Sequence, residues 1–319
     1  DHTDFSFCMF EPKTKPKKRI ELQTFPVGSK AINKAMSLLK KYLMNYPILN
    51  QKLFEIDFLS NQIGELIIAL NFHKKIDEKE FIENAKALKQ DFSNEGLSAN
   101  FIGRAKKQSI LVDTDTILET IHTKDKDFYL YQVEGNFSQP NIYACQNMVQ
   151  FARDCCKDCS NTDLIELYCG SGTFTVCLAD LFRKVFSTEV SRIPTLTALK
   201  NIEKNHITNT KIARLSAVEV AQALQGVREF NRLKQIDVDI HDYNLNTLLI
   251  DPPRSGLEHK EALDFTASFN RVIYISCGPQ SLASDLEYLS KTHKIQKLAF
   301  FDQFPYTDHL ETGVLLVKK

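Results

Sequence analysis

The 319-residue chain carries no net charge, because 40 lysines and arginines balance 40 aspartates and glutamates. Without a global positive field, any contact with nucleic acid has to come from local basic patches. The sequence has no apolar run near the ~18 residues of a membrane-spanning helix, and no signal-peptide pattern. We therefore expect a cytoplasmic protein with no membrane contact. Because the chain opens on Asp1 and not on methionine, we also expect a further N-terminal segment.

The eight cysteines lack the regular pairs of a disulfide framework, which predicts reduced thiols. Cys145, Cys155, Cys156 and Cys159 raise the possibility of a metal site. A single helix from Asn141 to Cys159 would place Cys155 and Cys159 on one face and Cys156 aside, so four tetrahedral ligands would not converge. We therefore expect that these cysteines have structural roles and bind no metal.

The two halves of the chain differ in pattern, and a prior of about 150 residues per domain also predicts two domains. Residues 1–135 mix strands and helices without a glycine-rich loop, which is typical of an α+β domain. Residues 136–319 repeat strand, turn and helix, which predicts a doubly wound, mostly parallel sheet. The last two strands, Leu298–Phe301 and Gly313–Val317, are joined by a short loop, so the final strand should be antiparallel.

The first half carries three basic clusters, at Lys13 to Arg19, at His73 to Lys75, and at Arg104 with Lys106 and Lys107. Such clusters are typical of solvated surfaces and also of RNA-binding patches. Phe54 and His73 lie near predicted strand ends, where simple edge packing would also account for them.

A strand, a tight Gly-x-Gly turn and a helix start follow one another from Asp163 to Phe174. Gly170 and Gly172 allow backbone N–H groups to approach a ligand closely. The third glycine of the dinucleotide fingerprint and the Walker lysine are both missing, so NAD and ATP fit poorly. The next strand, Lys184–Thr188, ends at Glu189, whose carboxylate can accept two ribose hydroxyls. S-adenosylmethionine is therefore the favoured cofactor.

Two further strands lead into residues whose side chains could take part in catalysis. Leu248–Ile250 leads into Asp251-Pro252-Pro253-Arg254, a rigid loop with few backbone donors. Val272–Ser276 leads into Cys277 and then Gly278-Pro279, with Pro279 near the first position of a helix. Cys277 should lie at the C-terminal edge of the sheet, where ligands bind, and the helix N-terminus should lower its pKa. A buried structural cysteine is the alternative.

These residues resemble the bacterial TrmA-type tRNA (uracil-5-)-methyltransferase family. The motifs that carry the resemblance are Glu166–Gly172, Asp251–Gly256, Ser276-Cys277, Asp302–Glu311, Gln132–Glu134 and Phe137–Asn141. Together they are highly specific, and the similarity covers essentially the whole chain. It implies a class I S-adenosylmethionine-dependent methyltransferase fold for residues 136–319, Rossmann-like with an antiparallel last strand. A smaller α+β RNA-binding domain, residues 1–135, would precede it.

The resemblance also implies the roles of individual residues. Methyl transfer to C5 of the T-loop uridine at tRNA position 54 would use Cys277 as the nucleophile and Glu311 as the base. The positions that match the family's cofactor-binding residues are Gln139, Tyr168, Thr173, Glu189 and Asp251. Gly170 of the Gly-x-Gly turn is also expected to bind the cofactor. Thr173 stands where the family often has Asn. Phe54 and His73 match positions that steady the opened loop bases.

The proposed chemistry requires these residue types. Uracil C5 is a poor nucleophile, and addition of the Cys277 thiolate to C6 would make it reactive toward a methyl donor. Glu311 would then remove the C5 proton and allow the sulfur to leave. Arg254 could donate to a uracil carbonyl, where charge develops. The uridine would have to be flipped out of its stack to reach the thiol.

Three alternatives remain open. A ribosomal RNA uracil-5-methyltransferase often carries a cysteine-ligated iron–sulfur cluster, and no matching cysteine set is found here. A non-catalytic tRNA-binding or tRNA-folding module would not need Cys277 and Glu311. A base N-methyltransferase typically has an aromatic residue in place of Arg254. The expected partner is the T arm of tRNA, other RNAs with a T-like loop stay open, and no obligate protein partner is indicated.

Overall fold

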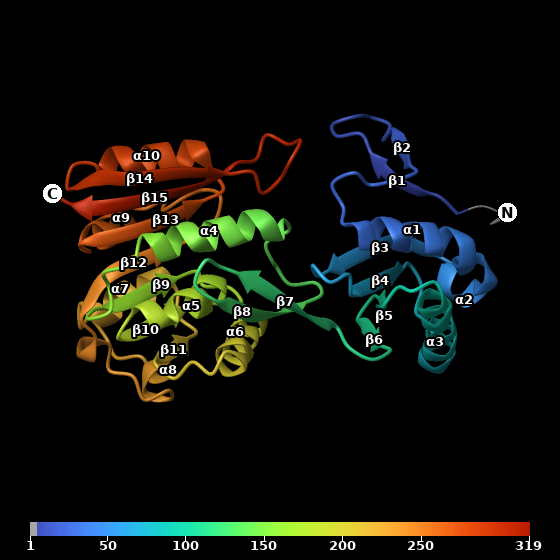
Figure 1. Ribbon diagram of the computed structural model, residues 1–319, viewed down its shortest axis with the longest axis horizontal. Coiled ribbons are helices and arrows are strands. Elements are labelled where there is room, and N and C mark those ends of the chain that lie inside the picture. Colours follow the sequence, from blue (N-terminus) through green and yellow to red (C-terminus); the bar gives the residue numbers. More distant parts are fainter. Residues whose placement is uncertain (1–4) are drawn as a thin grey trace. The chain divides into compact units, whose positions relative to one another are not determined.

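The computed structural model describes residues 5–319, which form two compact units. The first unit consists of the chain up to Glu119 together with Val133–Gly135. The second consists of Thr120–Gln132 and Asn136–Lys319 (Figure 1). The chain therefore enters the second unit, returns briefly to the first, and then completes the second.

The first unit is built on a four-stranded sheet in the order β3-β4-β5-β6. Its strands are β3 (Leu53–Ser60), β4 (Leu66–Phe72), β5 (Ala99–Ala105) and β6 (Gln108–Leu111). Only β4 and β5 pair in parallel. The other elements are β1 (Phe7–Phe10), β2 (Arg19–Leu22), α1 (Lys30–Tyr42), the 3-10 turn η1 (Leu43–Asn45), α2 (Pro47–Asn50) and α3 (Glu78–Asn94).

Local capping explains where the two long helices of this unit begin. The Ser29 hydroxyl accepts a hydrogen bond from the Ile32 amide at 3.1 Å, and Asp77 accepts one from the Glu80 amide at 2.9 Å. The sequence predicts a helix capped by Ser29 and a second helix from about Asp77 to Phe92, and both starts are confirmed. Weak alternation of polar and apolar residues from Asp4 to Phe10 predicts a strand. Strand β1 begins at Phe7, and Asp4 itself lies outside the described residues.

The second unit is built on a seven-stranded sheet in the order β11-β10-β9-β12-β13-β15-β14. Its strands are β9 (Asp163–Leu167), β10 (Lys184–Thr188), β11 (Thr210–Ala213), β12 (Leu245–Ile250), β13 (Arg271–Ser276), β14 (His293–Phe301) and β15 (Glu311–Lys318). The strands from β11 to β13 are parallel, whereas β15 runs antiparallel to both β13 and β14. The predicted doubly wound sheet with an antiparallel final strand is confirmed.

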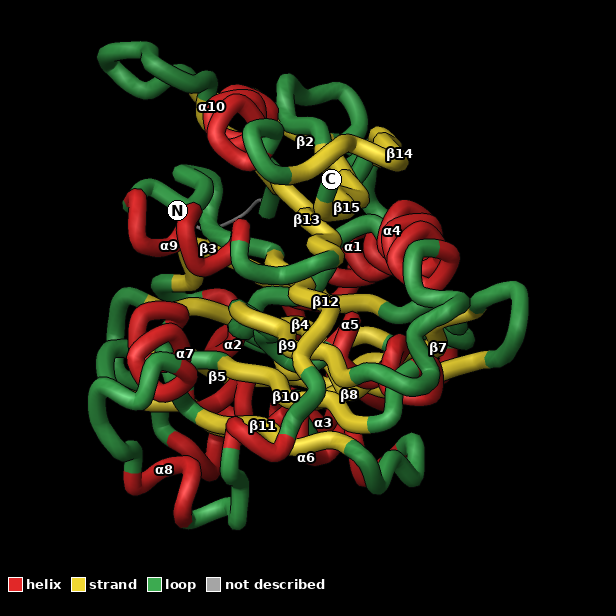
Figure 2. The backbone as a smooth tube through the Cα atoms, turned by 90° about the vertical axis from the view of Figure 1, so that its left-hand side faces the viewer, coloured by secondary structure: helices red, strands yellow, loops and turns green. Residues whose placement is uncertain are grey.

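Helices cover both faces of this sheet. One face carries α4 (Ile142–Asp154), α5 (Thr173–Leu178), the turn η2 (Ala179–Leu181), α6 (Arg192–Lys204) and the hairpin β7–β8 (Thr116–His122 and Asp127–Val133). The other carries α7 (Ala217–Leu224), α8 (Asn231–Lys234), the turn η3 (Ile240–Asp242), α9 (Lys260–Ala267) and α10 (Pro279–Leu289). Figure 2 shows α7 and α9 on one side of the strands and α4 with β7 on the other. Two apolar cores result, because successive strand residues point to opposite faces.

Some local features were not predicted correctly. The strands β2 and β7 were not predicted, and α4 ends at Asp154, not at Cys159. After Asp154 the chain leaves the helix through tight turns, in which the Cys156 amide donates to the Arg153 carbonyl and the Cys159 amide to the Cys156 carbonyl. Cys155, Cys156 and Cys159 therefore do not lie together on one helix, whereas the sequence had predicted that they would.

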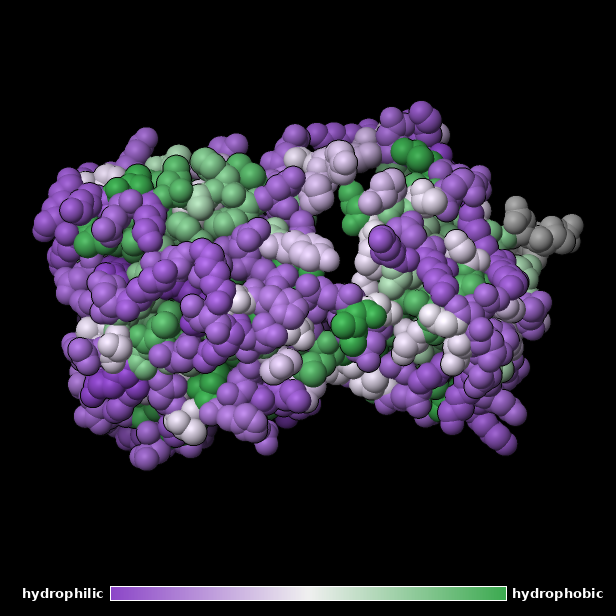
Figure 3. Space-filling view, in the orientation of Figure 1, coloured by the Kyte–Doolittle hydropathy of each residue, from purple (hydrophilic) through white to green (hydrophobic). Residues whose placement is uncertain are grey.

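The described residues contain no helix that combines the length and apolarity needed to span a bilayer, and no group of three or more potential metal-ligating side chains. Among the apolar side chains that reach the surface in Figure 3, one group lies over the region of β14 and α10. Leu298 and Phe300 of the edge strand β14 are 52% and 61% exposed there.

Candidate active site

Asp251, Cys277 and Glu311 lie at the ends of three neighbouring strands. Asp251 follows β12, Cys277 follows β13, and Glu311 is the first residue of β15. Because β15 runs antiparallel to β13, its first residue reaches the same edge as the last residue of β13. A carboxyl, a thiol and a second carboxyl from distant parts of the sequence thus meet at the C-terminal edge of the sheet.

Burial and mutual repulsion govern the protonation of these groups. Burial raises the pKa of Glu311 to about 7, and burial together with the charge of Glu311 raises that of Asp251 to about 8. The pKa of Cys277 is also raised, first by burial and then by the charges of Glu311 and Asp251. The site therefore tends to keep its acidic groups protonated.

The predicted lowering of the Cys277 pKa was wrong. A backbone hydrogen bond and the charge of Arg254 do lower it, but burial and the two carboxylates have the larger effect. The sequence could place Cys277 before a helix N-terminus, but it could not show that two carboxylates from other strands face the same thiol.

The loop of Asp251 is packed directly on the turn of Cys277. The Ser281 hydroxyl donates to the Arg254 carbonyl at 2.9 Å, and a Cβ at position 278 would collide with that same carbonyl oxygen. Gly278 is therefore required for this close approach. The arrangement holds Arg254, whose side chain is exposed, beside the half-buried Cys277.

The Gly-x-Gly turn adopts the left-handed backbone conformation at several positions. Tyr168 has a φ of 61°, and Gly170 and Gly172 have φ values of 54° and 81°. A Cβ at Gly170 would meet nothing within 4 Å, so its backbone faces open space, while Gly172 packs against Ala198 of α6. The strained Tyr168 is typical of a backbone held for function. Thr173 is the first residue of α5.

Glu189 joins this turn to the end of β10. Its carboxylate accepts hydrogen bonds from the Gly170 amide at 3.1 Å and from the Ser191 amide at 2.8 Å. These bonds orient the carboxylate at the tip of the second strand and leave it half-buried, so its remaining lone pairs can accept hydroxyl donors.

Gln139 is held by Gln303, a residue to which the sequence analysis assigned no role. The Gln303 carboxamide donates to Gln139 Oε1 at 2.5 Å, and the Asn141 carboxamide donates to the Asp302 carbonyl at 3.2 Å. Gln303 is 1% exposed, and its own Oε1 is buried without a hydrogen-bond partner among the described residues. The only indication in the sequence that Gln303 has a functional role was its position in the Asp302–Glu311 motif.

Phe54 and His73 belong to the first unit. Their rings stack, with centroids 4.0 Å apart and an interplanar angle of 12°. Both side chains are exposed, Phe54 by 53%. An exposed stacked pair presents flat faces to a base, whereas edge packing would bury them. Of the basic clusters, Arg104 is already ion-paired with the buried Glu134 of the same unit, while Lys106 and Lys107 are exposed.

The chain matches the family described as tRNA (Uracil-5-)-methyltransferase over residues 1–319. A tRNA/tmRNA (uracil-C(5))-methyltransferase of Psychromonas ingrahamii is 44% identical over 319 residues, which are 100% of this chain and 85% of that protein. The enzyme of the same name from Vibrio parahaemolyticus is 42% identical over 316 residues, which are 99% of this chain and 84% of that protein. This chain belongs to the tRNA (uracil-5-)-methyltransferase family.

A solved structure agrees in fold with this assignment. The tRNA (uracil-54, C5)-methyltransferase of Pyrococcus abyssi, in complex with S-adenosyl-L-homocysteine, matches with a TM-score of 0.69 at 19% sequence identity. The match covers 94% of this chain and 70% of that one. The fold is that of the S-adenosylmethionine-dependent methyltransferases, as the sequence predicted.

The residues at the edge of the sheet fit the cofactor of this methyltransferase family. A nucleoside with a free ribose needs an open backbone turn and a carboxylate acceptor, which Gly170 and Glu189 provide. The carboxamide of Gln139 is held in place by Gln303 and keeps its NH2 group for further donation.

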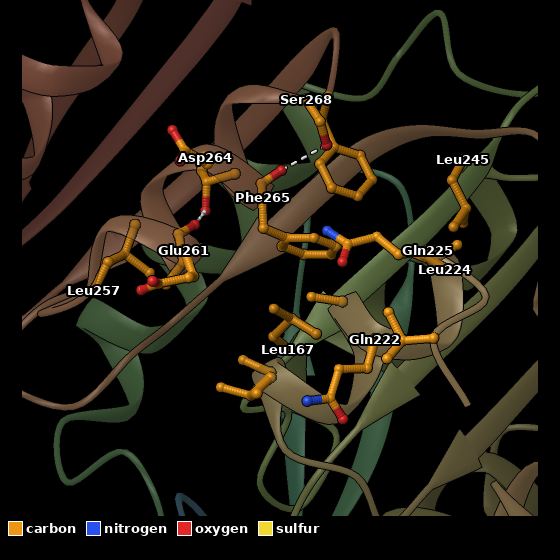
Figure 4. A pocket seen from close by; sticks show the side chains of 17 residues that line it. Leu167, Gln222, Leu224, Gln225, Leu245, Leu257, Glu261, Asp264, Phe265 and Ser268 are labelled. Carbon is orange, nitrogen blue, oxygen red and sulfur yellow. Dashed lines mark hydrogen bonds between the residues drawn. The ribbon is translucent and has the colours of Figure 1, made fainter. Parts of the chain in front are cut away.

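A separate apolar pocket of about 690 Å³ lies between α7 and α9 (Figure 4). Phe265, Gln225 and Leu167 are among its lining residues, and Figure 4 shows the first two directed toward one another. Cys277, Asp251 and Glu311 do not line it. The pocket is therefore distinct from the candidate active site.

Proposed function

We propose that this enzyme methylates C5 of the T-loop uridine at tRNA position 54 through a covalent adduct between Cys277 and C6 of the base. The observation that supports this most directly is the convergence of Cys277, Asp251 and Glu311 at one edge of the sheet, beside the Gly170 turn. Family membership supports the reaction type.

Cys277 acts as the nucleophile. Its pKa is raised in the free protein, so most of it is a thiol at neutral pH, and the charge of Arg254 favours the thiolate form. Addition of the sulfur to C6 places negative charge on the C4 carbonyl and makes C5 nucleophilic. Arg254 is exposed on the adjoining loop and donates to a uracil carbonyl as that charge develops. When bound, S-adenosylmethionine supplies an electrophilic methyl group.

Glu311 acts as the base that removes the C5 proton. A carboxylate with a pKa near 7 is a far better proton acceptor than an exposed one, because its acidity is matched to the pH at which the enzyme works. Loss of the proton from C5 re-forms the double bond and expels the Cys277 sulfur. The enzyme is then ready for another turnover.

The first unit binds the RNA. The stacked Phe54 and His73 offer an aromatic platform for bases of the opened loop, with lysines nearby for phosphates. The relatives are named for both tRNA and tmRNA, so an RNA with a tRNA-like T arm is the expected substrate class. Such a substrate would place the enzyme in the cytoplasm.

Two variants test the mechanism. With unmodified tRNA and labelled cofactor, Cys277→Ala should lose turnover while it still binds the cofactor, and Glu311→Gln should accumulate a protein–RNA adduct on a denaturing gel. Cys8→Ala and Glu258→Gln are the matched controls and should behave like the parent enzyme. Turnover by Cys277→Ala would end the covalent mechanism. Methylation of ribosomal RNA in place of tRNA position 54 would overturn the substrate assignment.

A further inference from the structure

A pair of thiols lies at the opposite end of β13 from Cys277. Arg271, the first residue of β13, contacts the turn that follows α4, whereas Cys277 follows the last residue of the strand. Six residues of extended chain separate Arg271 from Cys277, or about 20 Å at the usual rise of a strand. The thiols of Cys156 and Cys159 on this turn therefore have no part in the methyl-transfer site.

The backbone brings these two cysteines within bonding range. The Cys159 amide donates to the Cys156 carbonyl at 3.1 Å, which closes a turn over Cys156-Lys157-Asp158-Cys159. The ends of such a turn have Cα atoms less than about 7 Å apart, a separation that a disulfide can bridge. Each of the two thiols also shifts the pKa of the other. No large movement of the chain is required to join them.

The surroundings of Cys159 favour the thiolate form of its sulfur. The Arg271 guanidinium donates to Cys159 Sγ at 2.8 Å, and the Thr247 hydroxyl lies 3.9 Å from the same sulfur. The carboxylate of Asp158 opposes ionisation of Cys159, but it is itself paired with Arg271 at 2.6 Å. The hydrogen bond from Cys156 and the charge of Arg271 lower the pKa of Cys159 to about 7, against the effect of burial.

The other cysteines differ from this pair. The pKa of Cys156 is raised and that of Cys159 is lowered, so Cys159 is the sulfur of the pair that ionises first. Burial raises the pKa of Cys155 to about 11, despite the nearby Lys297 and Arg271. Among the described cysteines whose pKa is shifted, Cys159 is the one whose pKa is lowered. A thiolate next to a thiol in a Cys-x-x-Cys turn is the arrangement of redox-active dithiols.

We propose that Cys156 and Cys159 form a redox-active dithiol that small hydroperoxides convert reversibly into a disulfide. The Cys159 thiolate attacks a peroxide oxygen, so that an S–O bond forms, the O–O bond breaks, and the alkoxide or hydroxide leaves and takes a proton from water. Cys156 then loses its proton, and its sulfur attacks the Cys159 sulfenic acid; the S–S bond forms and water leaves. Sulfur loses two electrons in all, and the peroxide gains them.

Access to the pair is through the turn itself. Cys159 is 2% exposed and Cys156 is fully buried, but the side chain of Asp158 between them is 74% exposed. Reaction with a hydroperoxide therefore requires this short surface turn to open. Larger oxidants and alkylating agents should react more slowly.

Peptide mapping of the intact protein tests the proposal. Trypsin cleaves after Arg153, Lys157 and Arg183, so the two cysteines fall on separate peptides that only a disulfide keeps together. After one equivalent of hydrogen peroxide, the peptides 154–157 and 158–183 should be recovered as one linked species, and dithiothreitol should separate them. Cys155→Ser is the matched control and should keep the link.

Two variants and one pH titration test the roles of Cys156 and Cys159. Cys159→Ser should lose the link completely, and Cys156→Ser should lose it but accumulate a sulfenic acid at Cys159 that dimedone traps. In the untreated protein, carbamidomethylation of Cys159 should rise about tenfold from pH 6 to pH 8 and then level off, whereas an ordinary thiol would still be rising. A link that survives in Cys159→Ser, or the absence of a link in the parent protein, would overturn the proposal.

Discussion

The Tyr274 hydroxyl donates a hydrogen bond to the Asp285 carboxylate at 2.6 Å, inside the core between β13 and α10. Tyr274 is fully buried and Asp285 is 7% exposed. The same carboxylate oxygen accepts from the Leu257 amide at 3.0 Å, just after the Asp251–Gly256 loop. One buried carboxylate thus ties together the strand that precedes Cys277, the helix that follows it, and the loop that carries Arg254.

We expect Tyr274→Phe to lower the free energy of unfolding by about 2 kcal/mol, because a buried acceptor loses one of its donors. Urea denaturation would measure the change, and the turnover number should fall several-fold as the Arg254 loop loses its anchor. Tyr288→Phe is the matched control, because its hydroxyl also bonds an aspartate, Asp264, but at the surface. Equal stability of the two variants would show that the core bond contributes little.

Glu189→Gln should weaken binding of S-adenosylmethionine by tenfold or more, roughly 1.4 kcal/mol. The substitution removes the charge and one of the oxygens that bond Gly170 and Ser191, so the turn loses its orientation. Isothermal titration calorimetry with S-adenosylhomocysteine would measure the affinity. Glu203→Gln, on the exposed surface of α6, should leave it unchanged.

The kcat/KM of methyl transfer should rise as the pH increases through about 7. Below that pH Glu311 is protonated and cannot take the C5 proton, and above it the carboxylate is available. The raised pKa of Cys277 should make the profile continue to climb on the alkaline side. Asp308→Asn, in the same loop and exposed, should keep this profile. A rate that stays constant between pH 6 and pH 8 would argue against Glu311 as the base.

Stability should fall between about pH 5 and pH 8 because of Glu166, which accepts hydrogen bonds from Thr175 and Ser187. Burial raises its pKa to about 8, from an ordinary value of 4.5, so the folded state holds a proton that the unfolded chain has already lost. Unfolding in urea at pH 6 and pH 8.5 should differ by about 2 kcal/mol through this group. Glu166→Gln should reduce this pH dependence of stability, while Asp251 and Glu311, whose pKa values are also raised, keep their share. A dependence equal to that of the parent enzyme would show that Glu166 does not contribute.

Phe54→Ala and His73→Ala should each weaken RNA binding by about tenfold, since a stacked base contributes roughly 1–3 kcal/mol. The two effects should be less than additive, because either substitution destroys the same stacked pair. Phe54→Tyr keeps the ring and should bind like the parent enzyme. Fluorescence anisotropy with a T-arm hairpin would measure the affinities, and full additivity would mean that the two rings act separately.

Structural features that depend on neighbouring residues could be predicted from the sequence alone. The side chains of Ser29 and Asp77 cap the first turns of their own helices, Pro279 begins α10 with its fixed φ, and Gly170 and Gly172 form a left-handed turn. A short connection before the last strand requires antiparallel pairing. Each of these outcomes depends on neighbours within a few residues, so the helix starts, the glycine turn and the direction of the last strand could be predicted correctly.

The tertiary structure alone decided what distant residues do to one another. Gln303 holds Gln139 from 164 positions away, and Arg271 holds Cys159 from 112 positions away. The raised pKa of Cys277 and the end of α4 at Asp154 likewise depend on contacts between residues that are distant in the sequence. Burial, charge and hydrogen-bond geometry act through space, and which groups share a site is set only when the strands have paired and the helices have packed.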